Sequence, residues 1–254
     1  MNGIDIVKYL DAKYPKELAY EWDNVGLQIG SLNKKVTTIL ITLDVTKETI
    51  KEAITHQAEM IISHHPLIFK PIHSVTIESP RGWMINQLLK NDMTLYTMHT
   101  NYDLADGGMN DVLAALLGIS NPLLLDEIDK IGRYGDVEPM GMLAYIAKVK
   151  EVLNTDSVRF VGSLDKTVKR VGISGGSGSN HVGQAKKQNC DLYITGDVTY
   201  HTALDCEQMG LNVLDVGHYA EKVFKKAIFE DLKVNFPEIK IVISSIKTDP
   251  FTTL

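Results

Sequence analysis

Short apolar runs alternate with amphipathic stretches along most of the chain. Runs rich in β-branched and aliphatic residues at 36–43, 60–62 and 93–98 predict strands, because each is short and bounded by polar or turn-forming residues. Apolar positions at helical spacing predict helices between them, one capped by Thr46 and the other opened by Ser79 and the proline after it. This alternation of strands and helices predicts βαβ units and a mainly parallel sheet.

A second stretch of the same kind follows after an interruption. The periodicity breaks at 119–138, a segment with acidic residues, prolines and glycines, and we expect it to connect two α/β halves, 1–125 and 126–254. Beyond it, a helix is expected near 143–153, and strands and helices then alternate to the end of the chain. The expected strands are 169–174, 191–195, 212–216 and 239–246, and the expected helices are 180–189, 201–209 and one that begins near 223.

The two halves repeat the order strand, loop, helix, strand, polar loop, helix, strand, polar loop. Residues 61–65 align with 193–197 at an offset of 132 (193 − 61), and residues 93–103 align with 211–221 at an offset of 118 (211 − 93). Identity between the aligned segments is low, so a chance likeness of two βαβ units is the alternative to a duplication. In a duplicated fold, each half would carry its polar chemistry at the carboxyl edge of its parallel strands.

Composition narrows the functional classes. The chain has 254 residues, 44% of them hydrophobic, and a formal net charge of −6. Phosphate affinity needs concentrated positive charge, so this balance argues against bulk nucleic-acid binding. The sequence shows neither a signal-like segment nor an apolar run long enough to span a bilayer, and we expect a cytoplasmic protein with no membrane partner. Cys190 and Cys206 are too few for a cysteine-based zinc site, so any metal site must use His, Asp and Glu.

The densest chemistry in the chain is a pair of adjacent histidines. His64 and His65 end the apolar run 60–62 and precede Pro66, which favours an extended backbone at His65. Successive side chains of an extended chain diverge, so two adjacent imidazoles serve two metal ions more easily than one. The alternative is that both rings are structural and bond to backbone groups.

Three other polar clusters end strands or open helices. His99 and Asp103 form one, Asp197 with its preceding glycine forms another, and His218 and Glu221, three residues apart at a helix start, can face the same way. With the adjacent histidines, the first and last of these clusters offer four imidazoles and two carboxylates. That set exceeds the needs of one tetrahedral site and suits two ions bridged by a carboxylate.

Structural readings of these clusters stay open at this point. The segment at His99 would also fit a capped turn, and the segment at His218 a solvated first helical turn. Asp44 and Asp197 also end strands, where capping a helix or supporting a ligand is expected of them. The glycine-rich run 172–179 fits a flexible turn better than a phosphate loop, because it lacks the P-loop lysine and the dinucleotide fingerprint.

The chain resembles the Nif-three-like dinuclear-metal proteins, a family often named GTP cyclohydrolase 1 type 2 homologues. The resemblance covers nearly the whole chain. It is carried by five segments that occur in the family's order: 21–27, 63–69, 99–103, 195–197 and 215–221. Trp22, in the first of these segments, is expected to pack against the rest of the chain.

The resemblance implies an α/β fold of two interlinked, pseudo-duplicated halves with mainly parallel or mixed sheets, and a metal cleft between the halves. It also implies a ring-shaped homohexamer and two divalent metal ions per chain. Zinc, iron, manganese, cobalt and nickel all suit imidazole and carboxylate ligands without thiolate. The ligands implied are His64, His65, His99, Asp103, His218 and Glu221. Some family members place the last glutamate four residues after the histidine rather than three.

The activity implied is that of a dinuclear metal-dependent hydrolase that uses a metal-activated water, with GTP as the candidate nucleotide substrate. Two alternatives remain open on the sequence. One is a metal-stabilised hexameric regulatory or scaffold protein, which would not be an enzyme. The other is a metal-dependent phosphoesterase.

Overall fold

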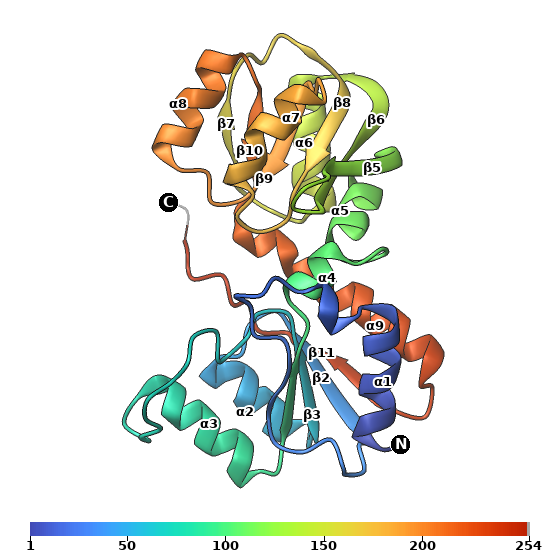
Figure 1. The fold of residues 1–254 in the computed structure, drawn as a ribbon, viewed down its shortest axis with the longest axis vertical. Helices are drawn as coiled ribbons and strands as arrows, with labels where there is room; N and C mark the ends of the chain where they lie inside the picture. Colours follow the sequence, from blue (N-terminus) through green and yellow to red (C-terminus); the bar gives the residue numbers. More distant parts are fainter. Residues whose placement is uncertain (253–254) are drawn as a thin grey trace. The chain divides into compact units, whose positions relative to one another are not determined.

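The computed structural model describes residues 1–252 as a mixed α/β chain with two separate sheets (Figure 1). The chain forms two compact units. The first combines Met1–Ala105 with Phe224–Pro250, and the second is built on Asp106–Val223. The prediction of an α/β fold with mainly parallel or mixed sheets is confirmed.

The first unit contains a five-stranded sheet in the order β1-β4-β3-β2-β11, in which β1 alone is antiparallel to its neighbour. Its strands are β1 (Gly26–Ile29), β2 (Thr38–Thr42), β3 (Met60–Ser63), β4 (Thr94–Thr97) and β11 (Lys240–Ile243). Its helices are α1 (Gly3–Lys13), η1 (Lys16–Leu18), α2 (Lys47–Thr55), α3 (Pro80–Lys90), α4 (Thr100–Leu104) and α9 (Val223–Asn235).

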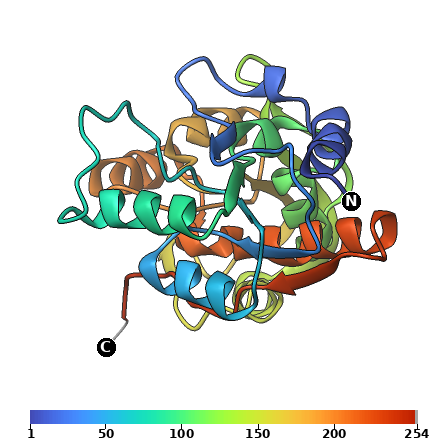
Figure 2. The ribbon, with the colours of Figure 1, turned by 90° about the horizontal axis from the view of Figure 1, so that it is seen from below.

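Helices cover both faces of this sheet. Figure 1 shows α2 and α3 on one side of the strands and α1 and α9 on the other, and α2 and α3 lie next to each other in Figure 2 as well. The caps expected at the starts of α2 and α3 are present: Thr46 accepts a hydrogen bond from the Thr49 amide, and Ser79 accepts one from the Gly82 amide. Ile50 and Leu88 are fully buried in the core beneath these two helices.

The second unit contains a six-stranded sheet in the order β5-β6-β8-β9-β10-β7, with β8, β9 and β10 parallel and the outer strands antiparallel. Its strands are β5 (Ser120–Asp126), β6 (Ile131–Gly141), β7 (Arg159–Val161), β8 (Thr167–Ile173), β9 (Leu192–Thr195) and β10 (Val213–Asp215). Its helices are α5 (Met109–Leu117), α6 (Met142–Val152), η2 (Ser179–His181), α7 (Val182–Lys187), α8 (Tyr200–Met209) and η3 (His218–Lys222).

The segment 119–138 does not form the connection that its composition suggested; it forms most of the β5–β6 hairpin. Pro122 is tolerated because β5 is an edge strand, and Pro139 lies where the pairing of β6 with β8 shifts register. Gly135 has no room for a side chain, since a Cβ there would lie 2.7 Å from Ile119 Cγ2. The residues that resembled a linker therefore shape an irregular pair of strands.

The expected division of the chain at 125/126 differs from the two observed units. Residue 125 lies within β5, inside the second unit. The last strand, expected in the second half, is β11, which pairs in parallel with β2 of the first sheet. Because α9 and β11 return to the first unit, that unit is built from two separate pieces of chain.

The two units repeat one order of elements. In each, a helix (α1 or α6) and a short strand (β1 or β7) precede three parallel strands joined by two helices, and a short helix (α4 or η3) follows. The strand β3 ends at Ser63 and β9 at Thr195, 132 residues later (195 − 63). The strand β4 ends at Thr97 and β10 at Asp215, 118 residues later (215 − 97). The offsets found in the sequence therefore match equivalent strand ends.

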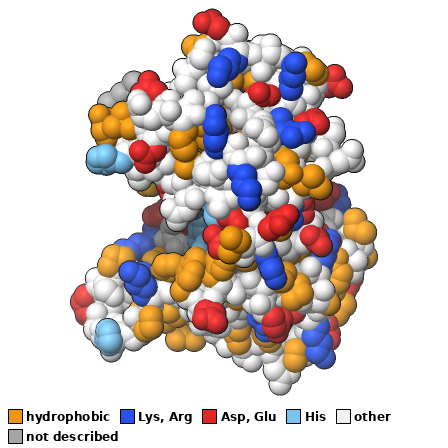
Figure 3. Space-filling view, turned by 45° about the horizontal axis from the view of Figure 1, so that its top comes forward, with side chains coloured by type: hydrophobic (Ala, Val, Ile, Leu, Met, Phe, Trp, Pro, Cys, Tyr) orange, Lys and Arg blue, Asp and Glu red, His pale blue; other side chains and the backbone are white. Residues whose placement is uncertain are grey.

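Lys and Arg side chains are interspersed with Asp and Glu on the face shown in Figure 3. Among the described residues, no helix is both long and apolar enough to cross a membrane.

Leu88 and Leu89 are neighbours on α3 and give a matched test of this packing. Leu88 is fully buried, whereas Leu89 is 59% exposed. We expect Leu88→Ala to lower the free energy of unfolding by about 2–5 kcal/mol, because it leaves a cavity. Leu89→Ala should change it by no more than about 0.5 kcal/mol. Urea titrations of both variants check this, and equal losses would contradict the assignment of the buried face.

Candidate metal centre

Three of the predicted ligands gather in the first unit. His64 and His65 follow β3, and His99 follows β4 and caps the start of α4. Each offers a ring nitrogen within 4.8 Å of those of the other two. Adjacent parallel strands place their carboxyl ends together, which brings residues 64 and 99 to one edge of the sheet.

Asp103 belongs to the same group. It lies in α4, one turn after His99, and is 8% exposed. Its Oδ1 lies 3.5 Å from His64 Nε2. The first unit therefore presents three imidazoles and one carboxylate as a half-site.

Each of these imidazoles is held through its Nδ1 by an oxygen atom. His64 Nδ1 donates to the Met98 carbonyl at 2.7 Å, and His65 Nδ1 donates to Asp44 Oδ1 at 2.6 Å. His99 Nδ1 lies 2.9 Å from both carboxylate oxygens of Asp23. A neutral imidazole that donates from Nδ1 carries its lone pair on Nε2, the atom that can bind a metal.

The second unit holds the remaining two predicted ligands. His218 and Glu221 lie in η3, directly after β10, and His218 Nε2 is 3.2 Å from Glu221 Oε2. His218 Nδ1 donates to Asp197 Oδ2 at 2.7 Å. All four candidate imidazoles therefore have the same tautomer-fixing arrangement, in which Asp44 and Asp197 are the acceptors for His65 and His218.

The support from Asp23 was not foreseen. Its side chain is fully buried and accepts hydrogen bonds from His99, the Thr100 amide and the Thr100 hydroxyl. Burial alone would raise the pKa of this carboxyl, but these bonds outweigh it and lower the pKa from 3.8 to about 2. Asp23 lies in the segment 21–27 that carried the family resemblance, and that was the available signal.

The glycine-rich run after β8 has a packing role. Glu221 is 3% exposed, and a Cβ at Gly176, where φ is +59°, would lie 2.8 Å from Glu221 Oε1. A Cβ at Gly175 would lie 3.2 Å from the same oxygen, and the Gly175 amide donates to Asn110 Oδ1. The missing side chains thus make room for the Glu221 carboxylate.

His181 pairs with Asp126 in the second unit. Its Nδ1 lies 3.1 Å from Asp126 Oδ2 and 4.0 Å from Asp129 Oδ2. The other oxygen of Asp126 accepts the amides of Ile128 and Asp129. The pair thereby fixes the turn between β5 and β6.

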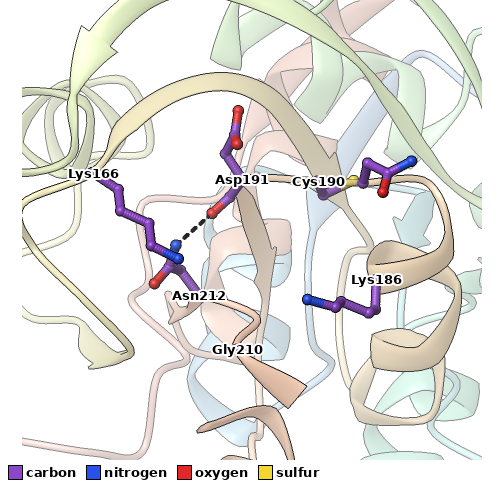
Figure 4. Close-up of a pocket in the computed structure, with 7 residues that line it drawn as sticks. Lys166, Lys186, Cys190, Asp191, Gly210 and Asn212 are labelled. Atoms are coloured by element: carbon purple, nitrogen blue, oxygen red, sulfur yellow. Dashed lines mark hydrogen bonds between the residues drawn. The ribbon is translucent and has the colours of Figure 1, made fainter. Parts of the chain in front are cut away.

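A separate cavity of about 240 Å³ lies in the second unit, where β9 and β10 begin (Figure 4). Burial raises the pKa of the Cys190 thiol there to about 12, so the thiol stays protonated near neutrality. The Asp191 carboxylate accepts hydrogen bonds from the backbone amides of Lys169 and Arg170, and the Asn212 side chain donates to the Asp191 carbonyl. The residues around the cavity, which are Lys166, Lys186, Asn189, Cys190, Asp191, Gly210 and Asn212, include none of the predicted ligands.

Comparison with known proteins identifies the family. The family model Duf34/NIF3 (NGG1p interacting factor 3) matches residues 1–250. The chain belongs to the Duf34/NIF3 family. A relative from Clostridium perfringens named GTP cyclohydrolase 1 type 2 homolog is 38% identical over 97% of each chain.

Solved structures of the family share the fold. A Bacillus cereus protein related to NIF3 matches with a TM-score of 0.93 and 29% identity, covering 100% of this chain and 99% of its own. A hypothetical protein of Staphylococcus aureus matches with a TM-score of 0.92 and 33% identity at the same coverage. These likenesses extend over the whole chain, so both α/β units belong to the NIF3 fold.

Asp23 generates a pH-dependent prediction. Its folded-state pKa of about 2 lies below the unfolded value of 3.8, so the ionised carboxylate stabilises the fold above about pH 4, and this contribution is lost as the pH falls through about 2. We expect Asp23→Asn to lower the free energy of unfolding by about 2 kcal/mol near pH 6, and the difference from the parent to shrink between about pH 4 and pH 2. Urea titrations of chelator-treated protein measure this, and a difference independent of pH would refute it.

Gly176 generates a prediction on metal affinity. Gly176→Ala should displace the Glu221 carboxylate and strain the backbone, weakening divalent-metal binding by about 10–100-fold, the range typical of altered ligand support. Gly183→Ala is the matched control, because no atom lies within 4 Å of a Cβ at that position. Competition with a chromophoric chelator measures both affinities. Unchanged affinity in a folded Gly176→Ala variant would remove Glu221 from the ligand set.

Proposed function

We propose that this NIF3-family protein is a metal-dependent hydrolase that holds two divalent metal ions per chain. The observation that carries the proposal is that His64, His65, His99 and His218 all donate from Nδ1 to an oxygen acceptor. Histidines that bind metals are almost always held in this way. His181 also donates from Nδ1 to a carboxylate, but the ring nitrogens of His64, His65 and His99 in addition lie within 4.8 Å of one another, which a structural role does not require.

The proposal takes its ligand candidates from both units. The chain crosses between the units at 105/106 and 223/224. Asp103 precedes the first crossing by two residues (105 − 103), and Glu221 precedes the second by two (223 − 221). Each crossing thus leaves from beside a carboxylate ligand candidate, and the proposed ligands are His64, His65, His99, Asp103, His218 and Glu221.

The donor set fits divalent metals of the borderline class. Imidazole and carboxylate without thiolate suit zinc, iron, manganese, cobalt or nickel. When bound, such ions lower the pKa of a coordinated water and polarise the substrate. In this scheme, the imidazoles, Asp103 and Glu221 would hold the ions, and Asp23, Asp44 and Asp197 keep three of the rings in the ligating tautomer.

We propose GTP cyclohydrolase activity as the first reaction to test, because the relatives carry that name. Hydrolysis would then open the imidazole ring of a guanine nucleotide in the cytoplasm. A phosphoesterase would use the same ions on a phosphodiester. The third candidate is a ring-shaped homohexamer in which the ions organise the assembly and catalyse nothing.

Metal analysis combined with turnover tests the proposal. Anaerobically purified protein should contain about two divalent ions per chain by elemental analysis, and turnover should be lost with His65→Ala. His73→Ala is the control, because His73 is exposed and takes part in none of the clusters. Less than one ion per chain in the parent protein would sink the proposal.

The same variants separate the rival functions. Loss of turnover in His65→Ala with an unchanged mass by light scattering favours the enzyme, whereas loss of the oligomer alone favours the scaffold. Production of formate from GTP identifies the cyclohydrolase, and hydrolysis of bis(p-nitrophenyl) phosphate without it identifies the phosphoesterase.

A further inference from the structure

An exposed aromatic cluster lies beside the candidate metal ligands of the first unit. Trp22 is 60% exposed, although tryptophan in this segment was expected to pack. Its ring stacks on Tyr20 at a centroid distance of 5.4 Å and an interplanar angle of 25°. Phe69 meets it edge-on at 5.9 Å, and His99 lies 6.4 Å away at 75°. Most of the Trp22 surface is therefore open to solvent, and its ring lies next to that of a ligand candidate, His99.

Hydrogen bonds from both sides hold this cluster in place. Next to Trp22, Asp23 is fully buried and bound to His99 and Thr100, and the Tyr20 amide donates to the Thr100 hydroxyl. On the other side, Gln28 accepts the Ile68 amide, and the Asn24 side chain donates to the Ile68 carbonyl. These bonds fix the loop before β1 against the segment that carries Phe69.

The exposure of the Trp22 ring distinguishes this cluster from the packing of a hydrophobic core. A core tryptophan buries its ring, whereas here the polar atoms on either side are satisfied and the ring is left outside. An exposed aromatic surface on a rigid loop suits stacking with a flat ring, which gains from the π-face of the indole whatever the substituents of its partner. The neighbouring His99 gives this surface a fixed position relative to the metal half-site.

We infer that Trp22, Tyr20 and Phe69 form a stacking platform that binds a planar heteroaromatic ring and presents it to the metal centre beside His99. The inference rests on the proposed function for the reaction, and it adds the residues that bind the flat nitrogen-containing ring of the substrate, such as a purine. A substrate without such a ring, including a simple phosphodiester, would leave the platform unused.

Tryptophan fluorescence can report on the platform directly. The chain has two tryptophans, and the other, Trp83, lies in α3 with Lys47 over its ring. The Trp83→Phe variant therefore leaves Trp22 as the single fluorophore. We expect GMP to quench this signal saturably in chelator-treated protein, and ribose 5-phosphate, which has no base, to leave it unchanged. Trp22→Phe, which keeps only Trp83, corrects for absorption of light by the ligand.

Substitution of Trp22 tests the energetic contribution. Trp22→Leu should weaken GMP binding by about tenfold or more, measured by calorimetry, because stacking on an aromatic side chain contributes on that order. Tyr200→Leu is the matched control, since Tyr200 is 73% exposed and pairs only with the ring of His201 among the ring contacts of the described residues. If turnover is found, KM should rise in Trp22→Leu with kcat less affected.

The outcomes distinguish the platform from the metal centre. Quenching of Trp22 by GMP in a protein that takes up less than one divalent ion per chain when metal is supplied would support the platform and reject the proposed hydrolase. Full metal content with unchanged GMP affinity in Trp22→Leu would reject the platform alone. Dissociation of an oligomer by Trp22→Leu, with GMP affinity unchanged, would also overturn the inference by making the cluster a subunit contact.

Discussion

The hydrogen bond from histidine Nδ1 to a fixed oxygen is the interaction on which the candidate site depends. It selects one tautomer, sets the angle of the ring and puts the lone pair on Nε2. The acceptor is a backbone carbonyl for His64 and a carboxylate for His65, His99 and His218. The carboxylates also add negative charge near the rings, which strengthens them as ligands of a cation. Without these acceptors, the rings could rotate and neither tautomer would be favoured.

The repeated architecture explains where these acceptors come from. Both units end three parallel strands at one edge, so each offers equivalent loops for polar residues. Position 65 is a histidine in the first unit, and its counterpart at 197 (65 + 132) is an aspartate that supports His218. At this position, the first repeat thus supplies a candidate ligand, and the second supplies the acceptor that holds another candidate ligand, His218. A duplicated scaffold whose loops have diverged gives a mixed set of donors without any new fold.

The errors in the sequence-based view share a physical cause. Proline and glycine mark both linkers and irregular strands, and only the partners decide between them. Pro122 is acceptable because no strand lies beyond β5, and Gly135 is required because Ile119 approaches it. Likewise, nothing local to residues 240–243 indicates that they pair with β2, some two hundred residues earlier in the chain. Strand pairing and close packing depend on residues that are far apart in the sequence, so the residues next to each position do not reveal them.

Local chemistry in the sequence determined the strands β2, β3 and β4, the caps at Thr46 and Ser79, and the choice of histidines at strand ends, because hydrophobic period and capping act over a few residues. Tertiary structure alone decided which oxygen holds each imidazole, since Asp23 and His99 are 76 residues apart. It also decided that Gly176 packs on Glu221 and that Trp22 stays exposed. Those outcomes depend on how distant segments pack, and packing is a property of the folded chain as a whole.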